Sequence, residues 1–310
     1  MRDLFNREIS YMRISLTDKC NLNCRYCKTS QPENFKSDIM SDDEIILIIE
    51  AASELGINKI RFTGGEPLLR KNIVSICSRT REIQAINEIC ITTNGIFLPE
   101  LAKSLRESGV ERLNISLDTL NPGKYSYITR GGCLDDALRG IRAAQENNFR
   151  VKLNTVLING FNDDEIRDLA EITINSNIDV RFIELMPMLE FNDAKKFMSS
   201  QKILEILPEL VPLKNDGVAK LYKLPDSHGN IGFISPISNA FCSSCNRIRL
   251  TADGYIKPCL HSETEIFVRH KNKSELKSLI IQAIESKPER HALISRKKTQ
   301  SLRPMNRIGG

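Results

Sequence analysis

The stretch Cys20-Asn21-Leu22-Asn23-Cys24-Arg25-Tyr26-Cys27 places three thiols within eight residues. Their spacing is CxxxCxxC, and an aromatic residue stands directly before the last cysteine. A loop of this kind can direct three sulfurs to one iron–sulfur cluster, whereas a four-iron cubane normally takes four thiolates. The stretch therefore predicts a cubane in which one iron stays open to bind a small molecule and pass it an electron.

The same three cysteines have two other interpretations. A structural zinc site takes four closed ligands, commonly from CxxC pairs, and no nearby His or Cys supplies the fourth here. Three unrelated buried thiols are the simpler alternative, which the regular spacing disfavours.

Composition indicates an ordinary globular protein. The chain has 310 residues, of which 27% are charged and 41% hydrophobic, enough for one barrel-sized domain plus an appendage. No secretory signal is visible at the start of the sequence, and the longest strongly apolar run, 45–49, is too short to span a bilayer. Nine cysteines then suggest metal ligation in a reducing cytoplasm. The net charge of +5 suits an anionic small molecule as well as nucleic acid.

Strand and helix patterns alternate through the first 186 residues. The expected strands are at 12–16, 59–63, 88–92, 112–116, 150–157 and 179–184. The expected helices between them are at 45–55, 73–83, 99–108, 134–147 and 164–175, the first preceded by a capping box, Ser41-Asp-Asp-Glu44. Short turns between such units favour parallel strands with right-handed crossovers. Six units are too few for an eight-fold barrel, so the sequence predicts an α/β fold, a partial (β/α)6 TIM-like barrel with an open side.

The pattern changes after residue 187. We expect a loop at 188–200, a short helix at 201–207, two strands within 220–234, a helix near 274–286 and a basic tail at 287–310. The chain is therefore divided into a barrel at 1–186 and a C-terminal extension at 187–310. A solvated, frayed end is the alternative interpretation of the tail.

Polar or sulfur-bearing residues follow several of the expected strands. In barrels of this kind, chemistry collects at the carboxyl ends of the strands. The residues just past those ends are Cys20, Gly64, Thr93, Asp118 and Met186. Their positions predict one shared site.

A second cysteine triad lies in the C-terminal extension. It consists of Cys242-Ser-Ser-Cys245 and, after thirteen intervening residues, Cys259. A zinc site that takes His261 as its fourth ligand stays open as an interpretation. Three thiolates on a second cubane, again with an open iron, is the sharper one.

Basic residues alternate with apolar ones on several expected strands. An inward charge on a barrel strand needs an anionic partner, and several converging cations would suit a polyphosphate. Taken singly, each is also explained by a salt bridge or an exposed face. The five residues are Arg13, Arg61, Lys152, Arg247 and Arg249.

These motifs together resemble a known family. The CxxxCxxC loop followed by Thr63-Gly-Gly-Glu-Pro67 resembles the radical S-adenosylmethionine (SAM) enzymes. Pairing with Phe241-Cys-Ser-Ser-Cys-Asn-Arg-Ile-Arg-Leu250 and the terminal Gly309-Gly310 narrows the resemblance to the GTP 3′,8-cyclase family, over essentially the whole chain. The activity that it implies is that of a lyase converting GTP to (8S)-3′,8-cyclo-7,8-dihydroguanosine 5′-triphosphate through a 5′-deoxyadenosyl radical, the first step of molybdenum cofactor biosynthesis.

The resemblance also assigns residues. Two [4Fe-4S] clusters are implied, one on Cys20, Cys24 and Cys27 and one on Cys242, Cys245 and Cys259. SAM-contacting positions are Tyr26, Gly65, Ser116 and Met186. The GTP-binding positions are Arg13, Arg61, Thr92, Lys152, Arg247 and Arg249, and Lys59 is a further candidate. The tail residues Gly309 and Gly310 are implied to enter the active site.

The resemblance implies partners too: GTP and SAM as substrates, an electron donor, and the cyclic pyranopterin monophosphate synthase that takes the product. It implies neither nucleic acid nor membrane, and it allows a homodimer. The first rival is another radical SAM enzyme with an auxiliary cluster, such as a peptide-modifying one, which typically carries more cysteines after the barrel. A zinc-bearing nucleic-acid binder and a pure electron carrier are further rivals, and metal analysis separates all of them.

Overall fold

The structure is a computed structural model of the chain and describes residues 1–28, 38–188, 194–291, 293, 299–301 and 303–309. Its strands form one twelve-stranded sheet in the order β12-β11-β10-β1-β2-β3-β4-β5-β6-β9-β8-β7. The strand bounds are β1 Tyr11–Ser15, β2 Lys59–Thr63, β3 Glu88–Thr93, β4 Arg112–Ser116, β5 Arg150–Leu157, β6 Asp179–Glu184, β7 Val211–Pro212, β8 Lys220–Lys223, β9 Ile231–Ile234, β10 Arg247–Leu250, β11 Tyr255–Lys257 and β12 Ile266–Phe267.

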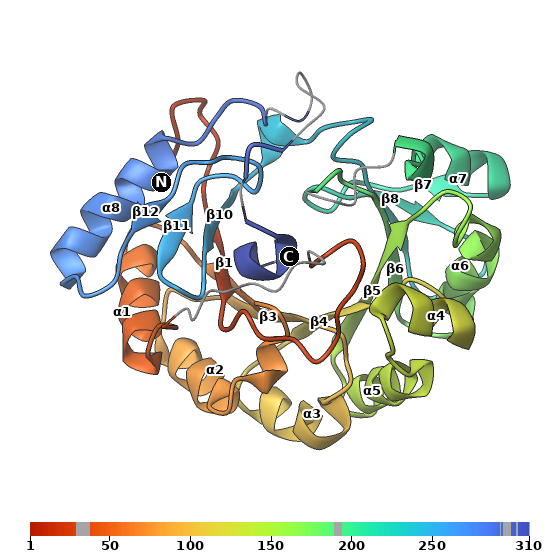
Figure 1. Ribbon diagram of the computed structural model, residues 1–310, viewed down its shortest axis with the longest axis horizontal. Coiled ribbons are helices and arrows are strands. Elements are labelled where there is room, and N and C mark those ends of the chain that lie inside the picture. Colours follow the sequence, from red (N-terminus) through yellow and green to blue (C-terminus); the bar gives the residue numbers. More distant parts are fainter. Residues whose placement is uncertain (29–37, 189–193, 292, 294–298, 302, 310) are drawn as a thin grey trace.

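Eight neighbouring strands of this sheet are parallel. They are β10, β1 to β6 and β9, and antiparallel strands extend each edge beyond them. The sheet curls into a ring that stays open on one side, and the helices lie outside it (Figure 1). The predicted partial barrel is therefore confirmed. The C-terminal part of the chain lengthens it at both edges, because β10 pairs with β1 and β9 pairs with β6.

The helices follow the predicted alternation closely. They are α1 Asp42–Ser53, α2 Ile73–Glu82, α3 Leu98–Glu107, α4 Pro122–Thr129, α5 Leu134–Glu146, α6 Ile166–Asn175, α7 Gln201–Ile206, α8 Lys273–Glu285 and the short α10 Met305–Ile308. The capping box before α1 is confirmed, since the Glu44 backbone N–H donates to the Ser41 hydroxyl and the Ser41 N–H donates to the Glu44 carboxylate. Helix α4 was not expected.

Alternation along the strands separates two environments. Side chains on one face are apolar and pack against the helices, as Met12 and Ile14 of β1 and Phe62 of β2 do. The opposite face carries polar and charged side chains such as Arg13 and Arg61, which line a cavity inside the ring. The hydrophobic core therefore lies between sheet and helices, and the interior of the barrel is polar.

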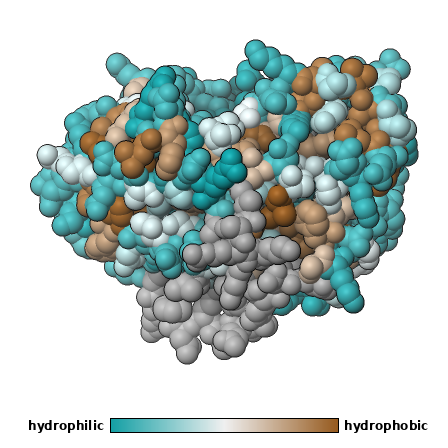
Figure 2. All heavy atoms as spheres, turned by 90° about the horizontal axis from the view of Figure 1, so that it is seen from above, coloured by the Kyte–Doolittle hydropathy of each residue, from teal (hydrophilic) through white to brown (hydrophobic). Residues whose placement is uncertain are grey.

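The predicted boundary at residue 186 falls within the continuous sheet. The barrel strands before it and the edge strands after it share backbone hydrogen bonds, so the division into 1–186 and 187–310 stays a prediction. The predicted loop 188–200 is only partly within the described residues. Figure 2 shows a face that is largely hydrophilic with separate apolar patches. Among the described residues, no helix is long and apolar enough to cross a membrane.

Candidate active site

One cavity of about 470 Å³ inside the ring is lined by residues of both cysteine triads. Cys20 follows the carboxyl end of β1, whereas Cys242 and Cys245 precede the amino end of β10, which is parallel to β1. Cys259 follows β11, which runs antiparallel to β10, so it returns to that same amino end. The two triads therefore lie at opposite ends of the strands that separate them.

The loop of the first triad is held against the end of helix α4. The backbone N–H of Asn23 donates to the Thr129 carbonyl at 3.1 Å, and that of Arg25 donates to the Ile128 carbonyl at 3.0 Å. The N–H of Cys27 closes a tight turn onto the Cys24 carbonyl at 3.0 Å. Helix α4, which sequence reasoning missed, is thus the support of this loop.

A buried carboxyl group lies beside the first triad. The Tyr26 hydroxyl donates to Asp118 at 2.7 Å, and the Val156 N–H donates to the other oxygen of that carboxylate at 2.9 Å. Burial raises the pKa of Asp118 to about 6 despite these hydrogen bonds. Burial also raises the pKa of Cys24 well above its usual value. Burial therefore favours the neutral forms of these groups at this end of the cavity.

The Gly64-Gly65-Glu66 turn packs directly on the cysteine loop. A Cβ on Gly65 would lie 2.2 Å from the Lys19 carbonyl oxygen, so the glycine is required by contact with the protein's own backbone. Glu66 is buried and accepts from the Thr93 hydroxyl at 2.7 Å and the Asn94 N–H at 2.8 Å. Burial raises its pKa to about 7. The turn thereby joins the ends of β2 and β3 to the cysteine loop.

The predicted SAM contacts all lie on the cavity wall. They are Tyr26, Gly65, Ser116 and Met186. Glu184, close before Met186, is a residue that sequence reasoning missed: it is buried, lines the cavity and accepts from the backbone N–H groups of Ile237 at 3.0 Å and Ser238 at 2.9 Å. Its carboxylate ties the end of β6 to the segment that leads to the second triad.

The second triad is supported by residues from both ends of the chain. Arg7 is buried and donates to the Cys242 carbonyl at 2.9 Å and to the Pro288 carbonyl at 2.8 Å. Lys287 is buried and donates to the carbonyls of Arg247 at 2.8 Å and Pro258 at 2.9 Å. Neither residue was predicted, and Lys287 had been assigned to a basic tail.

The electrostatics at this end are opposite to those at the first. Burial disfavours the charged form of Cys245, but the positive charges of Arg247 and Lys287 outweigh it and lower the pKa of that thiol to about 6. The Lys287 ammonium lies 3.5 Å from the Cys245 sulfur. A thiolate is therefore favoured at Cys245, which suits a metal ligand.

A row of guanidinium groups separates the two triads. In the register of the parallel strands, Arg249 of β10 lies beside Arg13 of β1, and Arg13 lies beside Arg61 of β2. All three are buried to different degrees and line the cavity with Arg247. Burial, together with the neighbouring Arg13 and Arg247 charges, lowers the pKa of Arg249 well below its usual value. Such a row is stabilised by a bound polyanion.

The remaining predicted GTP contacts differ in position. Thr92 lines the cavity and accepts from Arg61 at 3.4 Å, and Lys59 lines it as well. Lys152 is not among the lining residues; its ammonium lies 3.0 Å from carboxylate oxygens of Asp179 and Asp216. Asp216 itself lines the cavity. The assignment of Lys152 to GTP therefore stays a prediction.

The C-terminal segment enters the ring of strands. Figure 1 places α10 and the chain end at the centre of the barrel. Gly309 is buried, has φ of +79°, and a Cβ there would lie 2.3 Å from the Thr63 hydroxyl oxygen. Its carbonyl accepts a hydrogen bond from Arg249. The described tail is thus not a solvated end, while Gly310 lies outside the described residues.

The donor sets fit two clusters better than single metal ions. All nine cysteines are described and none of them forms a disulfide. Within the described part of the chain, no three His, Cys, Asp or Glu side chains are grouped to hold one ion. His261 instead contacts the Thr299 hydroxyl at 3.3 Å, and its ring lies against that of His291 with the centroids 4.9 Å apart and the planes tilted by 53°. A cubane spreads its ligands over several irons and so needs no such convergence.

Comparison with known proteins agrees with this site. The Radical SAM superfamily model matches residues 14–172, and the Molybdenum Cofactor Synthesis C model matches 178–293. Proteins named GTP 3′,8-cyclase from Alkaliphilus metalliredigens and Alkaliphilus oremlandii are each 45% identical, over 100% of both chains. The protein of that name from Clostridium perfringens is 43% identical over the same share.

Solved structures share the fold at lower identity. Streptococcus suis SuiB bound to S-adenosylmethionine has a TM-score of 0.66 at 15% identity, covering 89% of this chain and 66% of that one. Native anSMEcpe with bound AdoMet has a TM-score of 0.60 at 15% identity, covering 92% and 82%. The full-length matches to the curated cyclases are much closer. The chain therefore belongs to the GTP 3′,8-cyclase family of the radical SAM superfamily.

Proposed function

We propose that this protein converts GTP to (8S)-3′,8-cyclo-7,8-dihydroguanosine 5′-triphosphate with SAM as cosubstrate, in the first step of molybdenum cofactor biosynthesis. One observation carries the proposal: a single cavity has a thiol triad at each end and a row of guanidinium groups between them. Full-length similarity to curated GTP 3′,8-cyclases supports it.

Cys20, Cys24 and Cys27 would hold one [4Fe-4S] cluster and Cys242, Cys245 and Cys259 a second, each leaving one iron open. When bound, the clusters and SAM supply an electron and a 5′-deoxyadenosyl radical that removes hydrogen from C3′ of GTP. The protein's own contribution is binding, orientation and exclusion of competing reactions.

Charge distributes the two substrates between the ends. SAM carries a sulfonium and an ammonium besides its carboxylate, and the first end presents the buried carboxyls of Glu66 and Asp118. Glu66 directs one oxygen to Asn94 alone, which leaves that oxygen able to accept from an ammonium. Tyr26, Gly65, Ser116 and Met186 complete this part of the wall.

The arginine row would bind the triphosphate of GTP. Arg13, Arg61 and Arg249 lie on adjacent strands, and their planar groups each offer paired donors to phosphate oxygens. Arg247, Thr92, Lys59 and Lys152 are further members of the proposed set. Anchoring the phosphates on strands fixes the ribose relative to the first end of the cavity.

The tail residues Gly309 and Gly310 belong to the same proposed site. The Gly309 carbonyl accepts from Arg249, so the tail contacts a guanidinium that would also bind substrate. We further propose that residues 1–186 and 187–310 act as barrel and extension, and that the protein acts in the cytoplasm, where its nine cysteines stay reduced. An electron donor and the cyclic pyranopterin monophosphate synthase are the proposed partners, and a homodimer is compatible with the proposal.

The test is anaerobic incubation of the iron-loaded protein with GTP, SAM and a strong reductant. Mass analysis should find 5′-deoxyadenosine together with a cyclic nucleotide of the same mass as GTP, since the hydrogen atom that C3′ gives to the 5′-deoxyadenosyl radical is replaced by one electron from the reductant and one proton. Iron analysis should give about eight irons and no zinc per chain. SAM cleavage without any nucleotide product would instead favour a radical SAM enzyme with another substrate, such as a peptide.

A further inference from the structure

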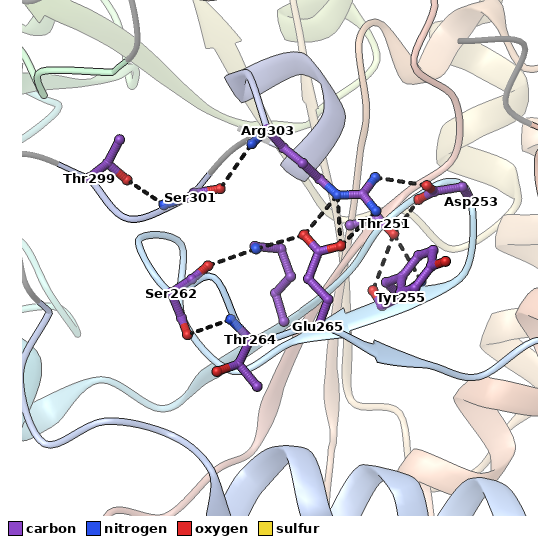
Figure 3. A network of polar contacts seen from close by, with 10 residues as sticks. Thr251, Asp253, Tyr255, Ser262, Thr264, Glu265, Thr299, Ser301 and Arg303 are labelled. Atoms are coloured by element: carbon purple, nitrogen blue, oxygen red, sulfur yellow. Dashed lines mark hydrogen bonds and ion pairs between the residues drawn. The ribbon is translucent and has the colours of Figure 1, made fainter.

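A network of ion pairs fixes the C-terminal segment well before Gly309. The Arg303 guanidinium donates to both carboxylate oxygens of Glu265, with Nε distances of 2.7 and 2.9 Å, and to Asp253 at 2.8 Å (Figure 3). The aromatic ring of Tyr255 lies 5.0 Å from the guanidinium carbon. The side chain is only 18% exposed, so this is a partly buried, forked interaction.

The partners of Arg303 are themselves held in place. Asp253 accepts from the Thr251 hydroxyl at 2.6 Å, and Glu265 accepts from the fully buried Lys257 ammonium at 2.9 Å. Two cations and two carboxylates therefore balance in this network, which Figure 3 shows between the tail and the β10–β11 turn. A planar guanidinium loses little conformational entropy when it binds partners that are already held in place. It also binds them in a single geometry.

The network belongs to the elements that carry the second triad and the substrate arginines. Thr251 and Asp253 lie in the turn directly after β10, the strand of Arg249. Glu265 and Lys257 flank Cys259 in sequence. One rigid β unit therefore contacts the tail at Arg303 and again, through Arg249, at the Gly309 carbonyl.

The segment between these two contacts makes contacts of its own, since the Asn306 amide donates to the Asp18 carbonyl at 3.4 Å and Arg307 lies 3.6 Å from the Asp18 carboxylate. Helix α10 has four residues and no side-chain cap, and a single turn of helix is unstable by itself in water. Beyond α10, Gly309 fits against Thr63 with no space for a Cβ. The attachment at Arg303, on the amino side of α10, adds to these contacts in directing Gly309 into that narrow space.

We infer that Arg303 is a positioning residue of the reaction: through Glu265 and Asp253 it holds the C-terminal segment so that the Gly309 carbonyl reaches Arg249 on the cavity wall. The inference rests on the proposed function for its catalytic consequence. Loss of the anchor should leave SAM cleavage in place, because the cysteine loop of the first triad is held by backbone hydrogen bonds to helix α4. It should reduce the share of cleaved SAM that leads to cyclic nucleotide.

The experiment compares iron-loaded Arg303→Gln with wild type and with Arg142→Gln, a control that removes an exposed guanidinium from the outer helix α5. Hydrogen exchange of the amides of residues 305–309 is measured first, and the ratio of cyclic nucleotide to 5′-deoxyadenosine second. Arg303→Gln should exchange at least tenfold faster there and give at least a tenfold lower ratio. Arg142→Gln should match wild type in both.

Two further variants keep the inference testable if Arg303→Gln does not fold. Arg303→Lys keeps the charge but not the fork, so both readouts should fall between those of wild type and Arg303→Gln. Asp253→Asn removes one partner and should change both in the same direction, with no added effect in the Arg303→Gln background. Unchanged exchange, or faster exchange with an unchanged product ratio, would overturn the inference. If wild type makes no cyclic nucleotide, the proposed function fails, and the exchange data still test the anchor.

Discussion

The two ends of the cavity solve the same problem, holding three thiols, in different ways. At the first end, the sulfurs come from one loop of eight residues that rests on helix α4. At the second, they come from two segments that flank β10 and β11 and are supported by Arg7 and Lys287. The first site depends mainly on local sequence, while the second depends on the completed fold.

The two ends also differ in their electrostatic environment. Glu66 and Asp118, both buried, line the first, and their pKa values are raised by burial to about 7 and about 6. The second is basic enough to lower the pKa of Cys245 to about 6 against the effect of burial. Under the proposed function, the cationic cosubstrate SAM and the polyanionic GTP would bind at different places in this one cavity.

Replacing one cysteine at each end should separate the two roles most sharply. Cys24→Ala should abolish 5′-deoxyadenosine formation, because two thiolates do not hold a cubane with a single open iron. Cys245→Ala should keep SAM cleavage and the first cluster while the cyclic nucleotide is lost. Each variant should hold about four irons per chain, against about eight in wild type. Persistent SAM cleavage in Cys24→Ala would refute the assignment of the first end.

Arg13→Ala should weaken GTP binding at the arginine row between the two ends without affecting SAM. A charge-assisted hydrogen bond to phosphate typically contributes about 1.5–3 kcal/mol, or roughly ten- to a hundredfold in affinity. Calorimetric titration of each ligand measures this, with Arg150→Ala as a control because Arg150 is an exposed arginine of β5. An equal loss of affinity for SAM and GTP would show that the ends are not separated by charge.

Gly309→Ala should reduce cyclic nucleotide by about tenfold while SAM cleavage continues. The added Cβ would meet the Thr63 hydroxyl at 2.3 Å and would also be strained at φ of +79°. Gly131→Ala is a matched control, since Gly131 has φ of +108° but no atom within 4 Å of the new Cβ. If both variants lose product to the same extent, backbone strain and not the narrow space is the cause.

The smallest effect concerns Asp118 and pH. The pKa of Asp118 is about 6 in the folded protein, above its ordinary value of 3.8, so the folded state binds this proton more tightly than the unfolded state does. The free energy of unfolding therefore decreases as pH rises through this interval. Asp118→Asn removes this dependence, so between pH 4 and 6 wild type should lose about 2 kcal/mol relative to the variant. Denaturant unfolding at several pH values measures it, and parallel curves for the two proteins would contradict the burial argument.

Sequence reasoning succeeded where the determinants are local. The capping box Ser41–Glu44 and the alternation of strands and helices are both confirmed by the structure. These features depend on neighbouring residues and on simple periodicity. Helix α4 was missed because Gly123, two tyrosines and two β-branched residues weaken its helical pattern, although Asn121 before Pro122 is a helix start signal.

The rest of the site depends on contacts between distant segments. Arg7 reaches Pro288, and Lys287 reaches Pro258, across separations that no periodicity encodes. The edge pairings of β10 with β1 and of β9 with β6 likewise follow from tertiary packing. The inward direction of Arg13 was predictable from alternation, but its position between two other arginines was not.

The pairing of β1 with β10 also sets an order of assembly. Tyr11 pairs with Arg247, so the first strand made during synthesis waits for one made far later. Until then β1 is an edge strand whose backbone N–H and C=O groups are exposed on one side and open to wrong pairing. Such long-range closure slows folding. A chain shortened before β10 keeps the whole cysteine loop at 20–27 but leaves this edge exposed, so we expect it to aggregate rather than to act as a smaller SAM-cleaving enzyme.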